Sequence, residues 1–206
     1  MTFFIEYTGP RNQNEEYKTV INFGSWADAN FSTDPDTSLS TTGTVHSIDI
    51  KPVVIPPKRE KGISGIIARI GETNGPVAWS SKTQSVVALS SFESEYYAAA
   101  QAVQEALAQA EMLEELNISV NKPLLIQEDN MACIWYTNHP GDYEKTKHIK
   151  RKFHFVQQHV ADGDVELVYC NTTQNLADFF TKCLTEEVFL FYRSVMMRQR
   201  LLSDLD

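Results

Sequence analysis

Four acidic residues lie where the surrounding pattern would aim them at one place: Asp28, Glu95, Asp129 and Asp178. Converging carboxylates repel one another strongly, and bound cations are the natural way to make such a cluster stable. Carboxylate oxygens are hard ligands that suit magnesium or manganese. Two such ions about 4 Å apart can activate water and stabilise the leaving oxygen of a phosphodiester. These four acids are therefore the candidate catalytic and metal-binding residues.

The first two acids belong to a strand and a long helix. Residues 18–31 alternate β-branched and aromatic residues with others and then break into a turn, which predicts a strand with Asp28 near its end. The clearest helix runs from about 92 to 116, and Ser90 and Glu93 have capping-box spacing at its start. Glu95 precedes Ala99 by one turn on a stripe of small residues, so we expect it to face the sheet.

The other two acids follow strands later in the chain. Residues 123–127 form a short apolar strand, and Asp129 comes directly after it, before a helical stretch at 131–136. A strand at 165–169 precedes a helical segment at 175–183, which carries Asp178 in its first turns. Further strands are expected at 41–50 and about 75–80, and a further helix at about 146–160. These strand and helix ends can converge on one edge of a sheet.

Each acid taken alone has a simpler explanation. The chain has 27 Asp and Glu residues, and helix N-termini such as those expected near Asp129 and Asp178 favour carboxylates for purely structural reasons. Only the set of four points to a metal site.

Composition excludes several functional classes. A chain of 206 residues with 42% hydrophobic content is long enough for one substantial core. Its apolar runs fall short of the roughly 20 residues of a membrane helix, and Glu6 comes too early for a signal peptide. We expect no membrane partner, no secretion, and a location in the cytoplasm or nucleus. No phosphate-binding glycine loop or nucleophile elbow is present, so no small-molecule cofactor is expected.

The basic residues are concentrated in one segment. Although the net charge is -9, a run beginning at Lys145 contains Lys147, Lys150, Arg151 and Lys152. Two interpretations stay open: a solvated helix face, or a face that holds nucleic-acid phosphates.

Several ordered blocks resemble the ribonuclease H domain of copia-type retrotransposons. The early blocks are Ala27-Asp28-Ala29-Asn30-Phe31, Ser40-Thr41-Thr42-Gly43, Gly75-Pro76-Val77-Ala78-Trp79-Ser80-Ser81-Lys82 and Val87-Ala88-Leu89-Ser90-Ser91-Phe92-Glu93-Ser94-Glu95-Tyr96. The later blocks are Glu128-Asp129-Asn130, Thr146-Lys147-His148-Ile149 and Asn175-Leu176-Ala177-Asp178-Phe179-Phe180-Thr181-Lys182. The resemblance covers about residues 20–184, and ordered blocks are far more specific than a lone motif.

The resemblance implies an α/β, ribonuclease H-like fold, with a mixed five-stranded sheet flanked by helices. It places the catalytic quartet on the same four acids and implies two Mg²⁺ ions, with Mn²⁺ as a substitute. The implied activity is cleavage of the RNA strand of RNA–DNA hybrids, with an upstream reverse transcriptase segment as a possible partner. Asn130, beside Asp129, is the residue that we would choose for contact with a 2′-hydroxyl. The sequence leaves the oligomeric state open.

The domain organisation follows from where the blocks begin and end. We expect an N-terminal extension at 1–17, a domain at 18–184 and a C-terminal helical tail at 185–206. An inserted loop at about 46–74 departs from the family pattern, where the second and third strands should form a hairpin. Asn30 and Lys150 also depart from it. The alternative function is therefore a decayed or repurposed retrotransposon fragment that only binds nucleic acid or protein.

Overall fold

The computed structural model describes residues 18–53, 75–139 and 150–197. Its centre is a mixed sheet with the strand order β3-β2-β1-β5-β6. The strands are β1 (Lys18–Asn30), β2 (Thr41–Val53), β3 (Gly75–Thr83), β5 (Leu124–Glu128) and β6 (Val165–Tyr169). β1, β2 and β3 are antiparallel neighbours, whereas β5 and β6 run parallel to β1. A sixth strand of two residues, β4 (Ser119–Val120), pairs with β1 and is an addition to the expected five.

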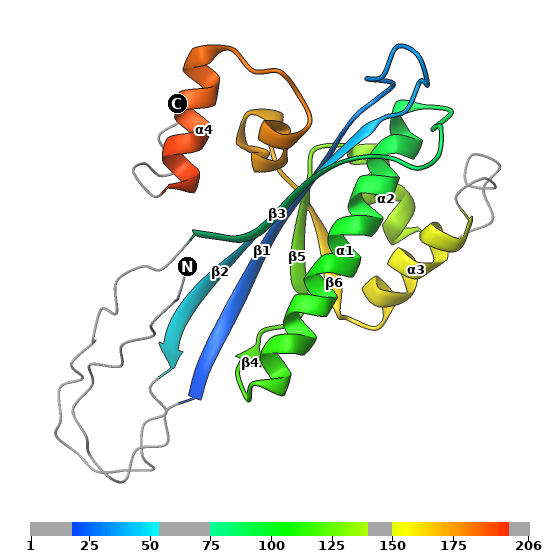
Figure 1. Cartoon of the computed structure of the whole chain (residues 1–206). Coiled ribbons are helices and arrows are strands. Elements are labelled where there is room, and N and C mark those ends of the chain that lie inside the picture. Colours follow the sequence, from blue (N-terminus) through cyan, green and yellow to red (C-terminus); the bar gives the residue numbers. More distant parts are fainter. Residues whose placement is uncertain (1–17, 54–74, 140–149, 198–206) are drawn as a thin grey trace, which may run out of the picture.

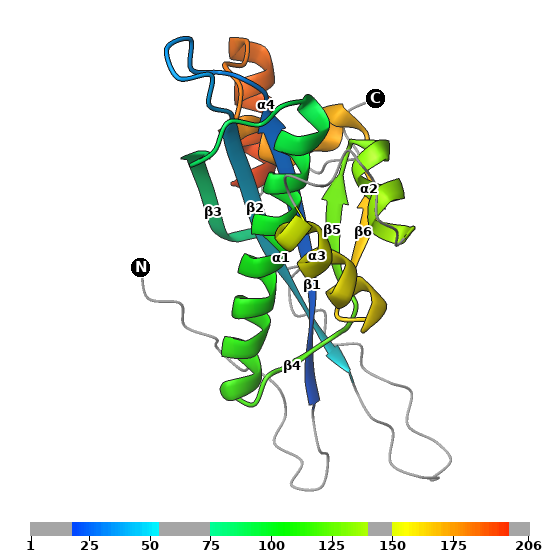
Figure 2. The same cartoon turned by 90° about the vertical axis from the view of Figure 1, so that its right-hand side faces the viewer.

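Helices cover both faces of this sheet. The helices on one side are α1 (Ser91–Glu115), α2 (Met131–Asn138) and α3 (Lys150–Ala161), and the 3₁₀ helix η3 (Leu176–Phe180) and α4 (Glu186–Met196) lie on the other (Figures 1 and 2). A one-turn 3₁₀ helix, η2 (Thr172–Gln174), precedes η3. The expected α/β class, a mixed sheet flanked by helices, is confirmed. Among the helices of the described ranges, none has the length and apolar character needed to cross a membrane.

The main core lies between the sheet and α1. Ala99, Ala102 and Ala106 are fully buried, so the predicted stripe of small residues does let α1 lie close to the strands. Ser90 caps α1 by accepting a hydrogen bond from the Glu93 backbone N–H at 3.2 Å. The Glu93 carboxylate reaches back to the N–H of Leu89 at 2.7 Å. Both bonds satisfy backbone donors at a helix start, where helical partners are lacking.

A second core lies on the opposite face of the sheet. It is formed by the buried residues Trp26, Val45, Cys170, Leu176, Ala177 and Tyr192. Tyr192 belongs to α4, and its hydroxyl donates to the carbonyl oxygen of Thr173 at 3.0 Å. The helix expected in the C-terminal tail is therefore present, and it covers part of the sheet that carries Asp28.

The strand expected at 41–50 is present and runs three residues further, into the segment assigned to an inserted loop at about 46–74. β2 continues through His46 to Val53, and its pairing with β1 extends to Lys18 opposite Val53. Past Ile48, which pairs with Gly75, β1 is the one strand among the described residues that pairs with β2, so Pro52 is tolerated there. The hairpin of β2 and β3 is intact, with one register shift between His46 and Ser47. Residues 54–74, the rest of the expected loop, lie outside the described residues.

The helical segment expected at 175–183 is shorter and tighter than predicted. Only Leu176–Phe180 is helical, and it is a 3₁₀ helix. The Asn175 side chain accepts from the Ala177 N–H and donates to the Ala27 carbonyl oxygen in β1. This tie to the sheet limits the segment to a local turn. The start of the helix expected at 146–160 lies outside the described residues, and α3 accounts for the rest.

Candidate active site

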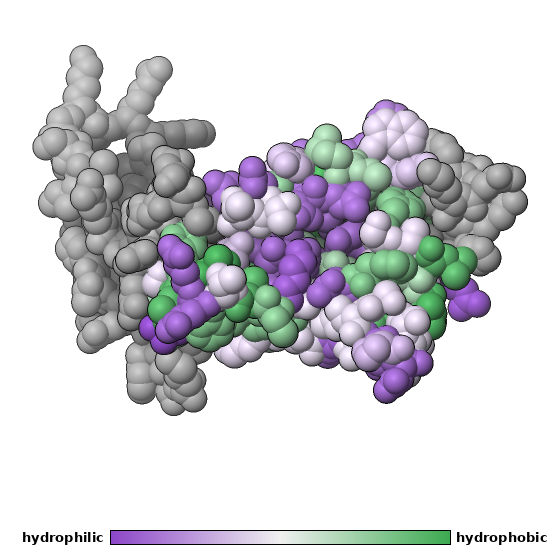
Figure 3. Space-filling model, turned by 90° about the horizontal axis from the view of Figure 1, so that it is seen from above, coloured by the Kyte–Doolittle hydropathy of each residue, from purple (hydrophilic) through white to green (hydrophobic). Residues whose placement is uncertain are grey.

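The acids meet where two parallel strands separate. β1 and β5 are paired only from Gly24 opposite Leu125 to Trp26 opposite Gln127. The pairing ends there, and Asp28 and Asp129 each follow two residues after the last paired residue of their side. A crevice at the carboxyl ends of parallel strands is a usual place for ligands in α/β sheets. Figure 3 looks onto this end of the molecule, where hydrophilic surface gathers near the middle, between hydrophobic patches.

Three of the four predicted acids form one compact group. Asp28, Glu95 and Asp129 each place a carboxylate oxygen within 4.8 Å of the others. Glu95 enters from the first turns of α1, and its carboxylate accepts from the Ala29 backbone N–H at 2.8 Å. The prediction that Glu95 faces the sheet is therefore confirmed.

The fourth acid joins the group through a lysine. Lys182 Nζ lies 2.6 Å from Asp178 Oδ1 and 3.5 Å from Asp28 Oδ1. Because these two distances add to about 6 Å, the two carboxylate oxygens can be no farther apart than that. Asp178 is thus beside Asp28, but it is not a member of the three-carboxylate group.

The pKa values in the metal-free site are those expected when several buried acids lie close together. Burial and then the charge of Asp178 raise the pKa of Asp28 to about 7. Burial and then the charges of Asp28 and Asp129 raise the pKa of Glu95 to about 9. Lys182 opposes both shifts, and although burial alone would lower its own pKa, the Asp178 hydrogen bond and the charge of Asp28 raise it. The single positive charge of Lys182 is therefore too little to balance the acids of the cluster.

Sequence reasoning missed a fifth carboxyl in this region. Glu128 is fully buried, and its Oε1 accepts from the Asn130 N–H at 3.1 Å, whereas Oε2 has no hydrogen-bond partner within the described part of the chain. Burial and then the charge of Glu95 raise the pKa of Glu128 well above its ordinary value. The strand alternation Leu124, Ile126, Glu128 already predicts an inward side chain at this position.

Three more residues that position Asp28 and Asp178 were not singled out. Thr181 donates a hydrogen bond from its hydroxyl to Asp28 Oδ2. Asn175 is fully buried and ties η3 to β1. A Cβ atom added to Gly43 would come within 2.7 Å of the Ala177 carbonyl oxygen, so η3 packs directly on the β2 backbone. Asp178 and Lys182 also have the (i, i+4) spacing that favours ion pairs on helices, a signal available in the sequence.

The predicted nucleic-acid contacts are only partly described. Lys150 and Arg151 are exposed at the start of α3, while Lys147 lies outside the described residues. Lys152 holds its Nζ 4.3 Å from the centre of the Tyr97 ring, a cation–π contact on α1. The Asn130 side chain caps α2 by accepting from the N–H groups of Ala132 and Cys133. Its oxygen therefore has a structural role already.

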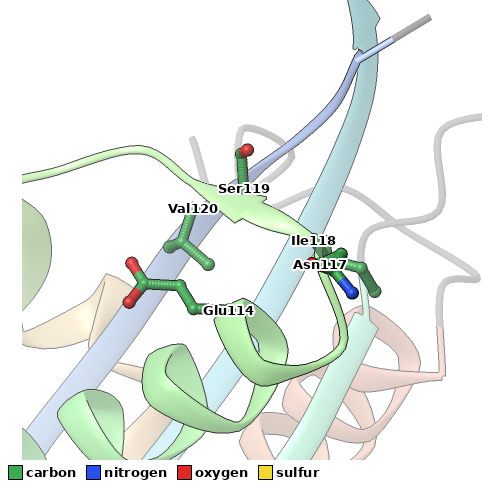
Figure 4. A pocket seen from close by; sticks show the side chains of 5 residues that line it. All are labelled: Glu114, Asn117, Ile118, Ser119 and Val120. Carbon is green, nitrogen blue, oxygen red and sulfur yellow. The ribbon is translucent and has the colours of Figure 1, made fainter.

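Two features outside the carboxylate cluster lack the properties of an active site. Ser25, His46 and Glu105 are hydrogen-bonded in series, with Ser25 Oγ 2.9 Å from Nδ1 and Glu105 Oε2 3.0 Å from Nε2 of His46. Ser25 and His46 are completely buried, so no substrate can reach them, and the trio is an internal polar network. A shallow pocket at the far end of α1 is lined by Glu114 and residues 117–120 and holds only one ionisable side chain (Figure 4).

The fold and the site together define the class of protein: an α/β domain whose mixed sheet gathers carboxylates at strand ends, as the ribonuclease H-like expectation requires. Sequence comparison gives the more particular relationship. The chain is similar to retrovirus-related Pol polyproteins from transposons RE1 and RE2 of Arabidopsis thaliana, with 33% identity over 131 and 126 residues. It is also similar to that of transposon TNT 1-94 of Nicotiana tabacum, with 30% identity over 117 residues. The expected kinship with copia-type Pol polyproteins is confirmed.

The matches cover 64%, 61% and 57% of the chain but only 9%, 8% and 9% of these relatives. No protein-family model matches the chain. Among solved structures, LC11 RNase H1 in complex with an RNA/DNA hybrid has a TM-score of 0.49 and 13% identity, covering 78% of this chain and 94% of that one. RNase H1 from Halobacterium salinarum has a TM-score of 0.49 and 12% identity, covering 87% and 99%.

Proposed function

We propose that this chain is a divalent-metal-dependent endoribonuclease that cleaves the RNA strand of RNA–DNA hybrids. The observation that carries the proposal is the convergence of Asp28, Glu95 and Asp129 at the separation of β1 and β5. Kinship with retrotransposon Pol polyproteins supports it, because copying RNA into DNA leaves hybrids whose RNA must be removed. The motif blocks of the ribonuclease H domain enclose the same three acids and Asp178.

The donor set fits hard divalent cations. The carboxylate oxygens of the three acids lie within 4.8 Å of one another, and burial followed by the charges of neighbouring carboxylates raises the pKa of Asp28 and of Glu95. A bound Mg²⁺ or Mn²⁺ would relieve this repulsion. Asp28, Glu95 and Asp129 would hold one ion, and Asp28 with Asp178 would hold a second. When bound, such ions lower the pKa of a coordinated water and neutralise charge on the phosphodiester.

The chain's own residues have two tasks in this proposal. The hydrogen bonds from the Ala29 N–H and from Thr181 fix the orientation of Glu95 and Asp28, so that the carboxylates need little rearrangement when an ion binds. Lys150 and Arg151 would hold hybrid phosphates without regard to sequence. An upstream reverse transcriptase segment is the proposed partner in the longer polyprotein.

The decisive experiment is cleavage of a hybrid with a labelled RNA strand, in the presence and absence of Mg²⁺. We expect cutting only with the metal, and we expect Asp129→Asn to lower the rate by about a hundredfold or more, because a lost ligand removes several kcal/mol of charge stabilisation. The folding stability of the metal-free variant should hold or rise, since one repelling charge is gone. Asp162→Asn, at an exposed position after α3, is the matched control and should cut normally.

The outcome also separates this function from the alternative of a fragment that only binds. Binding of the hybrid without metal-dependent cutting by the unaltered chain would refute the nuclease, as would a normal rate in Asp129→Asn.

A further inference from the structure

Lys182 occupies a position inside the carboxylate cluster. Its Nζ lies 2.6 Å from Asp178 Oδ1 and 3.5 Å from Asp28 Oδ1, so one ammonium group bridges the two acids. The side chains of Asp28 and Asp178 are 1% and 10% exposed, whereas that of Lys182 is 34% exposed. The two acids are thus fixed in the protein, and the cation between them has a path to solvent.

The cluster therefore has two halves with different contents. Asp28, Glu95 and Asp129 form the three-carboxylate half, which offers oxygen ligands within 4.8 Å of one another. Asp28 and Asp178 form the other half, and the cation in it belongs to the chain itself. Asp28 is shared by both.

We propose that Lys182 is an internal competitor for the second divalent ion, so that an ion can bind between Asp28 and Asp178 only by displacing the lysine ammonium group. This inference rests on the proposed function, because it takes the cluster to be a metal site. The first ion binds in the three-carboxylate half, where the ammonium group reaches the shared ligand Asp28 at the longer distance of 3.5 Å and competes less.

The physical reason is mutual exclusion of cations. The ammonium group lies 2.6 Å from Asp178 Oδ1 and so occupies space that a metal ion coordinating the same oxygen would need. Two cations held against one oxygen would also repel each other strongly. Lysine suits this role, because its compact charge sits on a flexible stem that can swing into water when displaced. In the metal-free state the same ammonium group compensates two buried acids that would otherwise be unpaired.

Counting bound Mn²⁺ in the absence of nucleic acid tests this proposal without any assay of cleavage. Electron paramagnetic resonance or titration calorimetry should find one tightly bound ion in the unaltered chain and a second that binds much more weakly. In Lys182→Met, the second ion should bind about tenfold or more tightly, the change expected when one charge-assisted hydrogen bond no longer has to be broken. The first ion should be affected far less.

Thermal unfolding provides a second measurement on the same variant. Without metal, Lys182→Met should melt at a lower temperature than the unaltered chain, because Asp28 and Asp178 lose their counter-charge. Excess Mn²⁺ should remove that difference. Lys182→Gln, which keeps a polar side chain of similar length, tests the same effect should the Met variant fail to fold.

The matched control is Lys122→Met, which also removes one positive charge. Lys122 pairs with Asp164 at 3.1 Å, outside the carboxylate cluster, so its loss should change neither ion. An unchanged second ion in both Lys182 variants would overturn the proposal, and so would equal tightening of both ions, which would indicate only a general effect of charge. Failure of the proposed function would look different: Mn²⁺ would bind as described, and no hybrid would be cut.

Discussion

At the scale of single residues, the site depends on acids that are unstable together. Asp28 and Glu95 have pKa values of about 7 and about 9 because of burial and then of neighbouring carboxylates. In the unfolded chain both would titrate near their ordinary values, around pH 4. The folded, metal-free protein therefore retains protons that the unfolded chain has already released.

This difference gives a prediction about stability and pH. Below about pH 4, Asp28 and Glu95 are protonated in both the folded and the unfolded state, so their ionisation does not lower the free energy of unfolding. As the pH rises from about 4 towards 9, the free energy of unfolding of the metal-free protein should fall, by up to about 1.4 kcal/mol per pH unit for each proton retained. Saturating Mg²⁺ should remove the part of the fall that comes from Asp28 and Glu95, because metal-bound carboxylates are ionised in the folded state too. Urea unfolding at pH 5, 7 and 8.5, with and without Mg²⁺, measures this.

The double variant Asp28→Asn, Glu95→Gln is the control for that experiment. It should lose most of the pH dependence that Mg²⁺ removes from the unaltered chain. A metal-free stability that stays level or rises between pH 5 and 8.5 would show that the cluster is not strained as described.

At the scale of elements, the sequence predicts the strands and helices well where each has its own pattern. The bounds expected for β6 are those observed, and β5 and α1 agree within one residue. The acids of the compact group were found because each belongs to such an element or directly follows one. The strand expected at 41–50 continues to Val53, since pairing with β1 extends β2 into residues that have loop composition.

The residues that support Asp178 illustrate what sequence patterns leave out. Gly43, Asn175 and Lys182 act through contacts between β2, β1 and η3, which are far apart in the chain. Glu128 was missed for another reason: a carboxyl group at an inward strand position is normally excluded by its cost of burial. Only a structure shows that this cost is borne beside a charged cluster.

Gly43 gives the prediction at this scale. Gly43→Ala would bring a methyl group within 2.7 Å of the Ala177 carbonyl oxygen and of Thr181, so η3 must move away from β2. Because η3 carries Asp178, we expect hybrid cleavage to fall by about tenfold or more, as displacements of roughly 1 Å in an active site do. Steady-state cleavage rates measure the effect, and circular dichroism should show a folded protein.

Gly24→Ala is the comparison for Gly43→Ala. Its added methyl group would meet Ser47 Oγ at 3.3 Å, a contact that the serine side chain can relieve. If the two variants cleave equally well, the close approach of η3 to β2 does not matter for the site.

At the scale of the whole molecule, the sheet is stabilised from both faces. The second core joins Trp26 and Val45 of the sheet to Tyr192 of α4, so the segment assigned to a tail contributes to the domain. Tyr192→Ala should lower the free energy of unfolding by about 3 kcal/mol, the usual cost of removing a large buried aromatic side chain. Phe189→Ala, at a position 43% exposed on the same helix, should cost much less. Denaturant unfolding compares the two, and equal effects would mean that α4 is not seated as described.

Charge distribution gives the last prediction at this scale. The net charge of the chain is -9, and the acids of the carboxylate cluster contribute to it. Lys150 and Arg151, by contrast, are exposed at the start of α3. If these two hold phosphates, replacing both with Ala should flatten the salt dependence of hybrid binding by about two units, one for each contact. Cleavage at saturating hybrid should change little, because ground and transition states lose the contact equally. An unchanged salt slope would indicate that Lys150 and Arg151 lie on a solvated helix face and do not bind phosphates.

The intact pairing of β1 with β2 separates the two ends of the sheet. Gly43 pairs with Asp28, and Val53 lies ten positions farther along β2, which at about 3.3 Å per residue is about 33 Å away. Gly75, where β3 begins, pairs with Ile48 on the same side of Gly43 as Val53. The connection between β2 and β3 is therefore attached far from the carboxylates. A fluorophore, an affinity tag or a surface tether attached where β2 ends or β3 begins would therefore stand away from the carboxylates, so that single molecules could be observed while they bind and cut.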